Sequence, residues 1–231
     1  IINGFTCTYK CNFNMAADNS RSIGLLVSKG RRVGIVEGSR NPDLNVDPGF
    51  FLSAAAVPVS GAEARSFPVQ VSLLEASEIT HETLSQFRVI ALAGVSTLNR
   101  AQVDALTAFV QNGGGLWLVP PSEDGAVGQF VASPLMRELL PIATIDRAKE
   151  GSGGLPAAAP YDHPITGFWN DGQSGSLEAF YIDRMLRIEK SDTAEGVLSL
   201  SNGNLLFVAQ QRGAGRVFCS AIPLDGAWTE L

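Results

Sequence analysis

The stretch NRAQVDALTAFVQNGGGLWLVP, residues 99–120, carries the clearest structural signal in this chain. Asn99 with Gln102 at the third following position is typical of a capping box at a helix start. Three apolar residues then recur at the spacing of one helix face: Val103, Leu106 and Val110. Glycines at 113–115 can adopt the left-handed conformation that ends helices, and the apolar run 116–119 predicts a buried strand. The stretch therefore predicts a helix that packs on a sheet and leads into one of its strands.

The same alternation of strand and helix extends from residue 32 to about residue 140. Apolar runs predict further buried strands at 33–36, 69–73 and 87–93. Helical patterns cover 50–57, which ends at Pro58, and 127–140, which is broken at Pro134. Because parallel neighbouring strands need crossover helices between them, this series favours an α/β fold with a doubly wound, mostly parallel sheet.

The pattern changes after residue 141. Residues 150–176 are rich in Gly, Ser, Pro and Ala and predict a long surface excursion. Only short strands are predicted beyond it, with turn residues between them, at 197–200, 205–210 and 216–222. We expect these strands to form a C-terminal antiparallel extension of the sheet, whose edges offer a route to a homodimer.

Composition and charge exclude several classes of protein. With 231 residues, of which 45% are hydrophobic and 17% charged, the chain can bury a core. Its 17 Lys and Arg against 23 Asp and Glu, a net charge of −6, argue against nucleic acid as a partner. The most apolar stretches are much shorter than the roughly 20 residues that cross a bilayer. We interpret 1–31 as a leader, a remnant of a preceding domain, and 32–231 as the α/β domain.

Cysteines and histidines do not indicate a metal site or a cofactor. Cys7 and Cys11 are four residues apart, which allows either a local disulfide or two free thiols. Neither His81 nor His163 lies at a spacing that would join them in a zinc site. Cys219 alternates with apolar neighbours and is predicted to be a small core residue.

Several phrases resemble the class I glutamine amidotransferase-like superfamily, a flavodoxin-like α/β fold. Residues 102–120 are the strongest local match. DHPITG at 162–167 and GAGRVF at 213–218 look like phrases of the trehalose-utilisation family within that superfamily. The resemblance covers roughly residues 32–228 and implies a flavodoxin-like sheet.

Other phrases look most like the extracytoplasmic domain of Bat-type and von Willebrand-A-associated bacterial membrane proteins. They are Asp18-Asn19, Phe50-Phe51-Leu52 and Ala227-Trp228-Thr229-Glu230. In those proteins such a domain follows a β-sandwich and precedes a membrane helix. The resemblance implies a membrane-anchored parent chain with this domain on the extracytoplasmic, periplasmic side, and it would explain a start at Ile1 without an initiator Met.

The sequence after the strand at 116–119 does not suit glutaminase chemistry. That reaction needs a cysteine nucleophile on a sharp strand-to-helix turn flanked by small residues, with a histidine and a carboxylate. Here the strand is followed by Pro120-Pro121-Ser122-Glu123-Asp124, without a cysteine. The sequence therefore favours a catalytically inactive domain that binds a ligand or a protein.

Candidate ligand-binding residues follow from the rule that open α/β sheets bind ligands at the carboxyl ends of their strands. They are Glu37, Ser39, Arg40, Ser122, Glu123 and His163. The alternative function is a hydrolase or sugar-modifying enzyme of the trehalose-utilisation kind, in which Glu37, Ser122 and His163 would converge. Against it, Ser122 and its acidic neighbours suit a helix cap, and His163 before Pro164 suits a turn.

Overall fold

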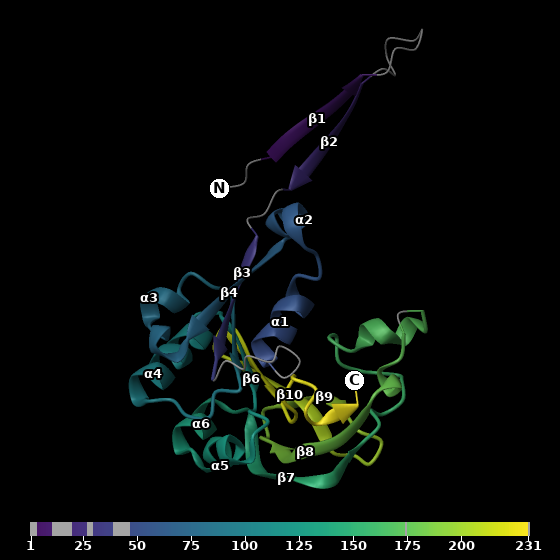
Figure 1. The fold of residues 1–231 in the computed structure, drawn as a ribbon. Helices are drawn as coiled ribbons and strands as arrows, with labels where there is room; N and C mark the ends of the chain where they lie inside the picture. The colour runs from purple at the N-terminus through teal and green to yellow at the C-terminus, as the bar shows by residue number, and fades with distance from the viewer. Residues whose placement is uncertain (1–3, 11–19, 27–29, 39–46, 174, 231) are drawn as a thin grey trace.

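A seven-stranded sheet forms the centre of the computed structural model, which describes residues 4–10, 20–26, 30–38, 47–173 and 175–230 (Figure 1). The strand order is β4-β3-β5-β6-β11-β10-β9. The strands are β3 (Arg31–Glu37), β4 (Val69–Glu75), β5 (Val89–Ala93), β6 (Gly115–Val119), β9 (Glu195–Ser199), β10 (Leu205–Arg212) and β11 (Gly215–Ser220). The first five strands in this order run parallel, and β10 is antiparallel to both of its neighbours. The predicted flavodoxin-like, mostly parallel sheet with an antiparallel extension is confirmed.

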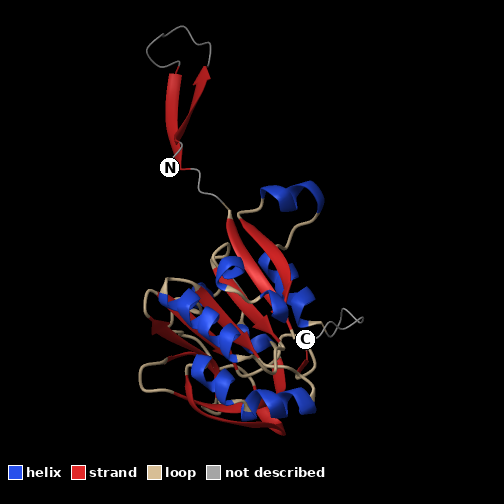
Figure 2. Cartoon of the chain, turned by 90° about the vertical axis from the view of Figure 1, so that its left-hand side faces the viewer, coloured by secondary structure: helices blue, strands red, loops and turns tan. Residues whose placement is uncertain are grey.

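Helices cover the two faces of the sheet unequally (Figure 1), and Figure 2 looks onto the face that carries more of them. One face packs against α3 (His81–Leu84), α4 (Arg100–Gln111), α5 (Asp124–Ala132) and α6 (Pro134–Leu139) in one large apolar core. A smaller core on the opposite face includes Ile35 of β3 and Leu52 of α1 (Pro48–Ala56). The short α2 (Gly61–Ser66) leads into β4.

Helix α4 forms as the sequence predicts. The Asn99 side chain accepts a hydrogen bond from Gln102 N at 3.0 Å, and Gln102 Oε1 accepts one from Asn99 N at 2.8 Å. The apolar stripe of Val103, Leu106 and Val110 is buried. After the helix, Gly113 takes a positive φ of 99°. Both ends of the helix are therefore specified by local chemistry, and its face by burial.

Helix α1 is also specified locally. The Asp47 side chain accepts from Phe50 N at 3.0 Å, and Pro48 occupies the first turn, where its missing N–H costs nothing. The helix ends at Ala56, two residues before Pro58. It contacts β3 and β4.

A second sheet of three strands corrects the prediction for the C-terminal part. Its order is β12-β8-β7, with β7 (Ile142–Gly154), β8 (Tyr181–Lys190) and β12 (Thr229–Glu230). Residues 150–154 of the predicted excursion belong to β7, and the expectation of only short strands after it was wrong, because β8 has 10 residues. Register shifts in β7 interrupt the period of two that identifies a strand. The rest of the described excursion includes the short turn η4 (Gly167–Asp171), and η5 (Leu177–Ala179) follows it.

The β9–β10–β11 hairpins are confirmed, with Gly203 and Gly213 at positive φ in their turns. Only β9 of this extension is an edge strand of the sheet, and a homodimer through it stays a prediction. The strands β1 (Gly4–Lys10) and β2 (Ser20–Leu26) pair antiparallel in a sheet of their own. The domain boundary at residue 31 stays a prediction, and so does the state of Cys7 and Cys11, since Cys11 lies outside the described residues.

Backbones touch at the carboxyl edge of the sheet. Gly38 N donates to Ala93 O at 2.9 Å, and Gly94 N donates to Val119 O at 3.1 Å. A Cβ atom on Gly38 would overlap the carbonyl group of Gly94. Only glycine at residue 38 allows the loops after β3 and β5 to meet.

We expect Gly38→Ala to lower the free energy of unfolding by about 1–3 kcal/mol, because the added methyl forces two backbones apart. Gly125→Ala is the matched control. Gly125 lies in α5 with open space around it, so alanine there should raise stability by about 0.5–1 kcal/mol. Urea unfolding of both variants measures the difference, and equal stabilities would contradict the close contact.

Candidate functional site

Glu37, the predicted ligand residue at the end of β3, lies against helix α1. A Cβ atom on Gly49 would overlap the Glu37 carboxylate, so this side chain sits over the first turn of the helix. A carboxylate is favoured there because the helix dipole is positive at its N-terminus. The predicted candidates Ser39 and Arg40 lie outside the described residues.

Ser122 and Glu123 follow β6 but do not cap the next helix with their side chains. The N-cap of α5 is Glu123, whose side chain makes no capping hydrogen bond, and Asp124 lies in the first turn. The acidic residues therefore lie at the helix start as predicted, whereas the interpretation of Ser122 as a cap is wrong. The Ser122 carbonyl instead accepts from Trp228 Nε1 at 3.3 Å. This bond ties the C-terminal segment to the loop after β6.

His163 orders its own turn. It is buried, its Nδ1 accepts from Ile165 N at 3.2 Å, and its carbonyl accepts from Thr166 N and Gly167 N. Its Nε2 lies 3.4 Å from Glu195 Oε1 of β9, without hydrogen-bond geometry. The local environment of His163 is that of a structural turn residue.

The structure does not bring Ser122, His163 and Glu37 together. His163 lies beside β9, and β9 is three strand spacings from β6, the strand before Ser122. At about 4.8 Å per strand this separation is roughly 14 Å. Glu37 is on β3, two strands farther from β9. A nucleophile and base within hydrogen-bond reach, which a hydrolase triad requires, are absent from this set of residues.

Cys219 is not a nucleophile. Its side chain is buried in the large core, and burial raises the pKa of the thiol to about 12. The reactive form of cysteine is the thiolate, which this environment suppresses. Among the residues that the structure describes, no group of three or more His, Cys, Asp or Glu side chains is placed to hold a metal ion.

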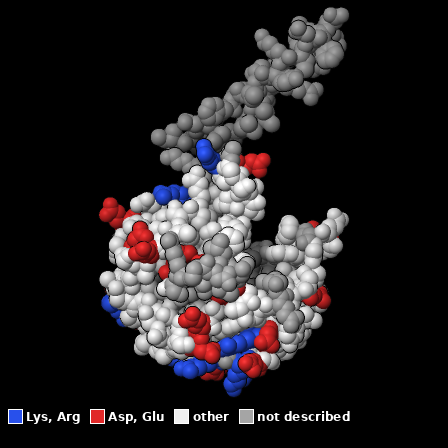
Figure 3. All heavy atoms as spheres, in the orientation of Figure 1, with Lys and Arg blue, Asp and Glu red and all other residues white. Residues whose placement is uncertain are grey.

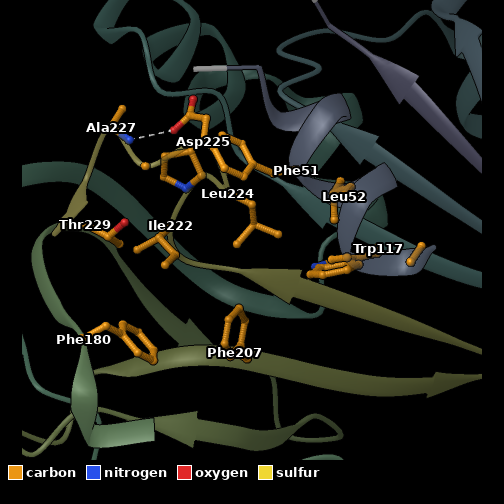
Figure 4. A pocket seen from close by; sticks show the side chains of 14 residues that line it. Phe51, Leu52, Trp117, Phe180, Phe207, Ile222, Leu224, Asp225, Ala227 and Thr229 are labelled. Atoms are coloured by element: carbon orange, nitrogen blue, oxygen red, sulfur yellow. Dashed lines mark hydrogen bonds between the residues drawn. The ribbon is translucent and has the colours of Figure 1, made fainter. Parts of the chain in front are cut away.

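A cavity of about 870 Å³ lies between α1 and the C-terminal segment 222–229 (Figure 4). Trp117 of β6 and Phe207 of β10 line it from the sheet. Helix α1 adds the apolar side chains of Phe51, Leu52, Ala55 and Ala56, and the loop that precedes β8 adds Phe180. In the view of Figure 3 most of the described surface is uncharged, and charged side chains of both signs gather mainly along its lower edge.

Two polar atoms in the wall of this cavity lack hydrogen-bond partners. Trp117 Nε1 and Thr229 Oγ1 are both buried and unpartnered, and Figure 4 shows the two residues on opposite sides of the pocket. Asp225, also in the wall, is satisfied in part, since its Oδ1 accepts from Ala227 N at 3.1 Å. A buried polar atom without a partner costs about 1–3 kcal/mol, so it needs an explanation such as a bound ligand.

A second cavity adjoins the first. Its volume is about 410 Å³, and Trp117 and Phe207 line both. It lies between the sheet and the 155–180 segment, which contributes Ile165, Trp169 and Leu177. The aromatic ring of Phe218 stacks on Phe207 with centroids 5.4 Å apart and completes this apolar surface.

The described residues among the predicted ligand residues lie outside the wall of the cavity of about 870 Å³, and ligand binding by them stays a prediction. Alternation in β6 places Trp117 on the face opposite Leu116 and Leu118, and this alternation was the sequence signal that could have placed Trp117 in the cavity wall. No sequence pattern predicts that Asp225 and Thr229 line the cavity, because the turn that brings segment 222–229 over the sheet is a tertiary feature.

Comparisons with known proteins identify the fold. No family model and no curated protein matches the chain. Among solved structures, the cytoplasmic protein STM3548 from Salmonella typhimurium is 16% identical, with a TM-score of 0.59 over 83% of this chain and 87% of that chain. A ThuA-like protein from Bacteroides uniformis is 12% identical, with a TM-score of 0.57 over 87% of this chain and 86% of that one. The exo-β-1,4-mannosidase Op5Man5 from Opitutaceae bacterium strain TAV5 is 14% identical, with a TM-score of 0.52, and the match covers 86% of this chain but 32% of the mannosidase.

At these identities the likeness concerns the fold alone. The ThuA-like neighbour agrees with the class I glutamine amidotransferase-like fold that the sequence resembles. The finer resemblance to Bat-type membrane proteins finds no match among these neighbours. In the parts of the chain that the structure describes, no helix has the length and apolar character to span a bilayer.

We expect Cys219 to resist a thiol reagent in the native protein and to react promptly in denaturant. With a folded pKa of about 12, the native thiolate fraction at pH 9 is about one in a thousand. The unfolded thiol ionises near pH 8.5, so this group makes the protein less stable as pH rises above that value, and the loss continues up to the folded pKa. Ellman's reagent applied to a Cys7→Ser, Cys11→Ser chain measures the rates, and equal labelling of native and denatured protein would contradict the buried thiol.

Proposed function

We propose that this chain is a non-catalytic α/β binding domain and that its ligand occupies the cavity between α1 and residues 222–229. The observation that carries the proposal is an apolar cavity of about 870 Å³ with two unpartnered polar atoms in its wall. Small-molecule sites usually have volumes of about 300–1,000 Å³ and apolar walls with a few polar groups.

The residues directly after β6 support a domain without catalytic activity. Pro120 and Pro121 provide no amide hydrogens for an oxyanion hole, and the turn that they begin contains no cysteine. Ser122 and His163 are separated by three strand spacings. The alternative of a hydrolase or sugar-modifying enzyme therefore lacks support from these residues.

The cavity wall indicates the chemistry of the ligand. An indole N–H is a hydrogen-bond donor only, so Trp117 requires an acceptor on the ligand. The Thr229 hydroxyl can donate or accept. Each square ångström of apolar surface that leaves water contributes about 25 cal/mol, and most of the side chains in the wall are apolar. The ligand is therefore an apolar molecule that carries at least one acceptor oxygen or nitrogen.

We expect Ala55→Phe to weaken binding of Nile red, a neutral apolar dye with a carbonyl acceptor, at least tenfold. Ala55 lines the cavity from the exposed side of α1, so a phenyl group there fills it without disturbing the core. Ala54→Phe is the matched control, because Ala54 is an exposed neighbour on the same helix outside the wall. Dye fluorescence titrations measure the affinities.

Thr229→Val should weaken the same binding about two- to tenfold if its hydroxyl contacts the ligand, the effect of one neutral hydrogen bond. Equal affinity of the Ala55→Phe variant and the wild type, or no dye binding by the wild type, would refute the cavity as the binding site.

We also propose, on the sequence resemblance, that the parent chain is a membrane-anchored bacterial protein with this domain on the extracytoplasmic side. The support is the set of phrases at 18–19, 50–52 and 227–230. Protease added to spheroplasts that produce the full parent chain should cleave the domain without lysis. Protection until the cells are lysed would contradict this location.

A further inference from the structure

A hollow rich in arginine lies at the amino ends of β3 and β5, at the opposite end of these strands from Glu37. Its volume is about 510 Å³. The residues that line it are Gly30, Arg31, Arg32, Gln86, Phe87 and Arg88. Three of them are arginines and none is acidic, in a chain whose net charge is −6.

The register of the sheet places two of these arginines side by side. Val33 pairs with Val89 in the parallel β3–β5 ladder, and Arg88 N donates to Arg32 O at 2.8 Å. Arg32 and Arg88, the residues before this pair, therefore lie opposite each other on the two strands. Because paired residues of neighbouring strands lie on the same face of a sheet, both side chains point to one face. Like charges in such a position are destabilising unless an anion neutralises them.

One of the two guanidinium groups is already held in place. Arg32 Nη1 donates to Gln86 Oε1 at 3.2 Å, and its guanidinium carbon lies 5.0 Å from the centroid of the Phe87 ring. Neither partner carries a negative charge, so these contacts do not compensate the positive charge of Arg32. An arginine ordered before binding loses less conformational entropy when a ligand arrives.

No ion pair in the described part of the chain involves Arg31, Arg32 or Arg88. The ion pairs of its other arginines join Arg100 to Asp104 and Glu138, and Arg184 to Asp124. The hollow therefore concentrates positive charge that the described part of the chain does not itself neutralise.

We propose that this hollow binds a phosphoryl group, with Arg32 and Arg88 as its principal ligands and Arg31 at the rim. Guanidinium forks match the geometry of phosphate oxygens and bind them with charge-assisted hydrogen bonds. A phosphate dianion neutralises both neighbouring charges, whereas a single carboxylate neutralises one. The volume of about 510 Å³ exceeds the size of a free phosphate ion and leaves room for the organic part of a phosphate ester.

Isothermal titration calorimetry at constant ionic strength tests the proposal with inorganic phosphate, phenyl phosphate and acetate. We expect the wild type to bind both phosphate probes at least tenfold more tightly than an Arg32→Gln, Arg88→Gln variant does, and acetate at least tenfold more weakly than phosphate. Tighter binding of phenyl phosphate than of inorganic phosphate would identify an ester as the ligand, and equal binding would identify the phosphoryl group alone.

Arg187→Gln is the control for charge alone, because Arg187 is an exposed residue of β8 outside the hollow. It should bind phosphate like the wild type. Arg88→Gln alone should also weaken phosphate binding and should not lower Tm in chloride, since it removes a like-charged neighbour and leaves the contacts of Arg32 intact, so its loss of binding cannot be attributed to unfolding. The same affinity in the wild type and the double variant, or acetate binding as tight as phosphate binding, would overturn the proposal. This site is separate from the apolar cavity, and the two tests fail independently.

Discussion

The apolar stripe of α4 against one face of the sheet is the contact on which the rest of the structure depends. Val103, Leu106 and Val110 are buried in one core with residues of β5, β6, β10 and β11. The faces of parallel sheets are usually both covered by helices. Four helices cover the α4 face, whereas α1, which contacts β3 and β4, is the main cover of the other. This unequal cover leaves the aromatic side chains of β6, β10 and β11 only partly buried.

The candidate ligand site follows from that inequality. Trp117, Phe207 and Phe218 stand on the less covered face, and segment 222–229 and the 155–180 segment approach them without filling the space. Contiguous apolar surface that a protein leaves open often marks a binding site, and two adjoining apolar pockets lie at this position. The edge that binds ligands in open α/β sheets is instead occupied by touching backbones at Gly38 and Gly94. The fold thus places its free volume on a sheet face and its tight contacts at the strand ends.

Sequence reasoning succeeded wherever the signal was local or strongly periodic. The helix after Asn99, the four strands at 33–36, 69–73, 87–93 and 116–119, and the terminal hairpins all appear close to their predicted bounds. It failed for β7 and β8, where register shifts and intervening charged residues hide the alternation. The predicted residues Ser122 and His163 lie on loops of distant strands, so the structure does not bring them together, and ligand binding by either stays a prediction.

The sequence by itself determined the α/β class, the main helix and strands of the sheet, the missing cysteine after β6 and the acidic net charge. These properties depend on short-range patterns and on composition, which a chain carries without its fold. Tertiary structure alone decided which face of the sheet is left partly open, that Thr229 meets the same cavity as Trp117, and that Arg32 and Arg88 are neighbours. Such juxtapositions depend on strand order and register, and those are set by the packing of segments that lie far apart in the sequence.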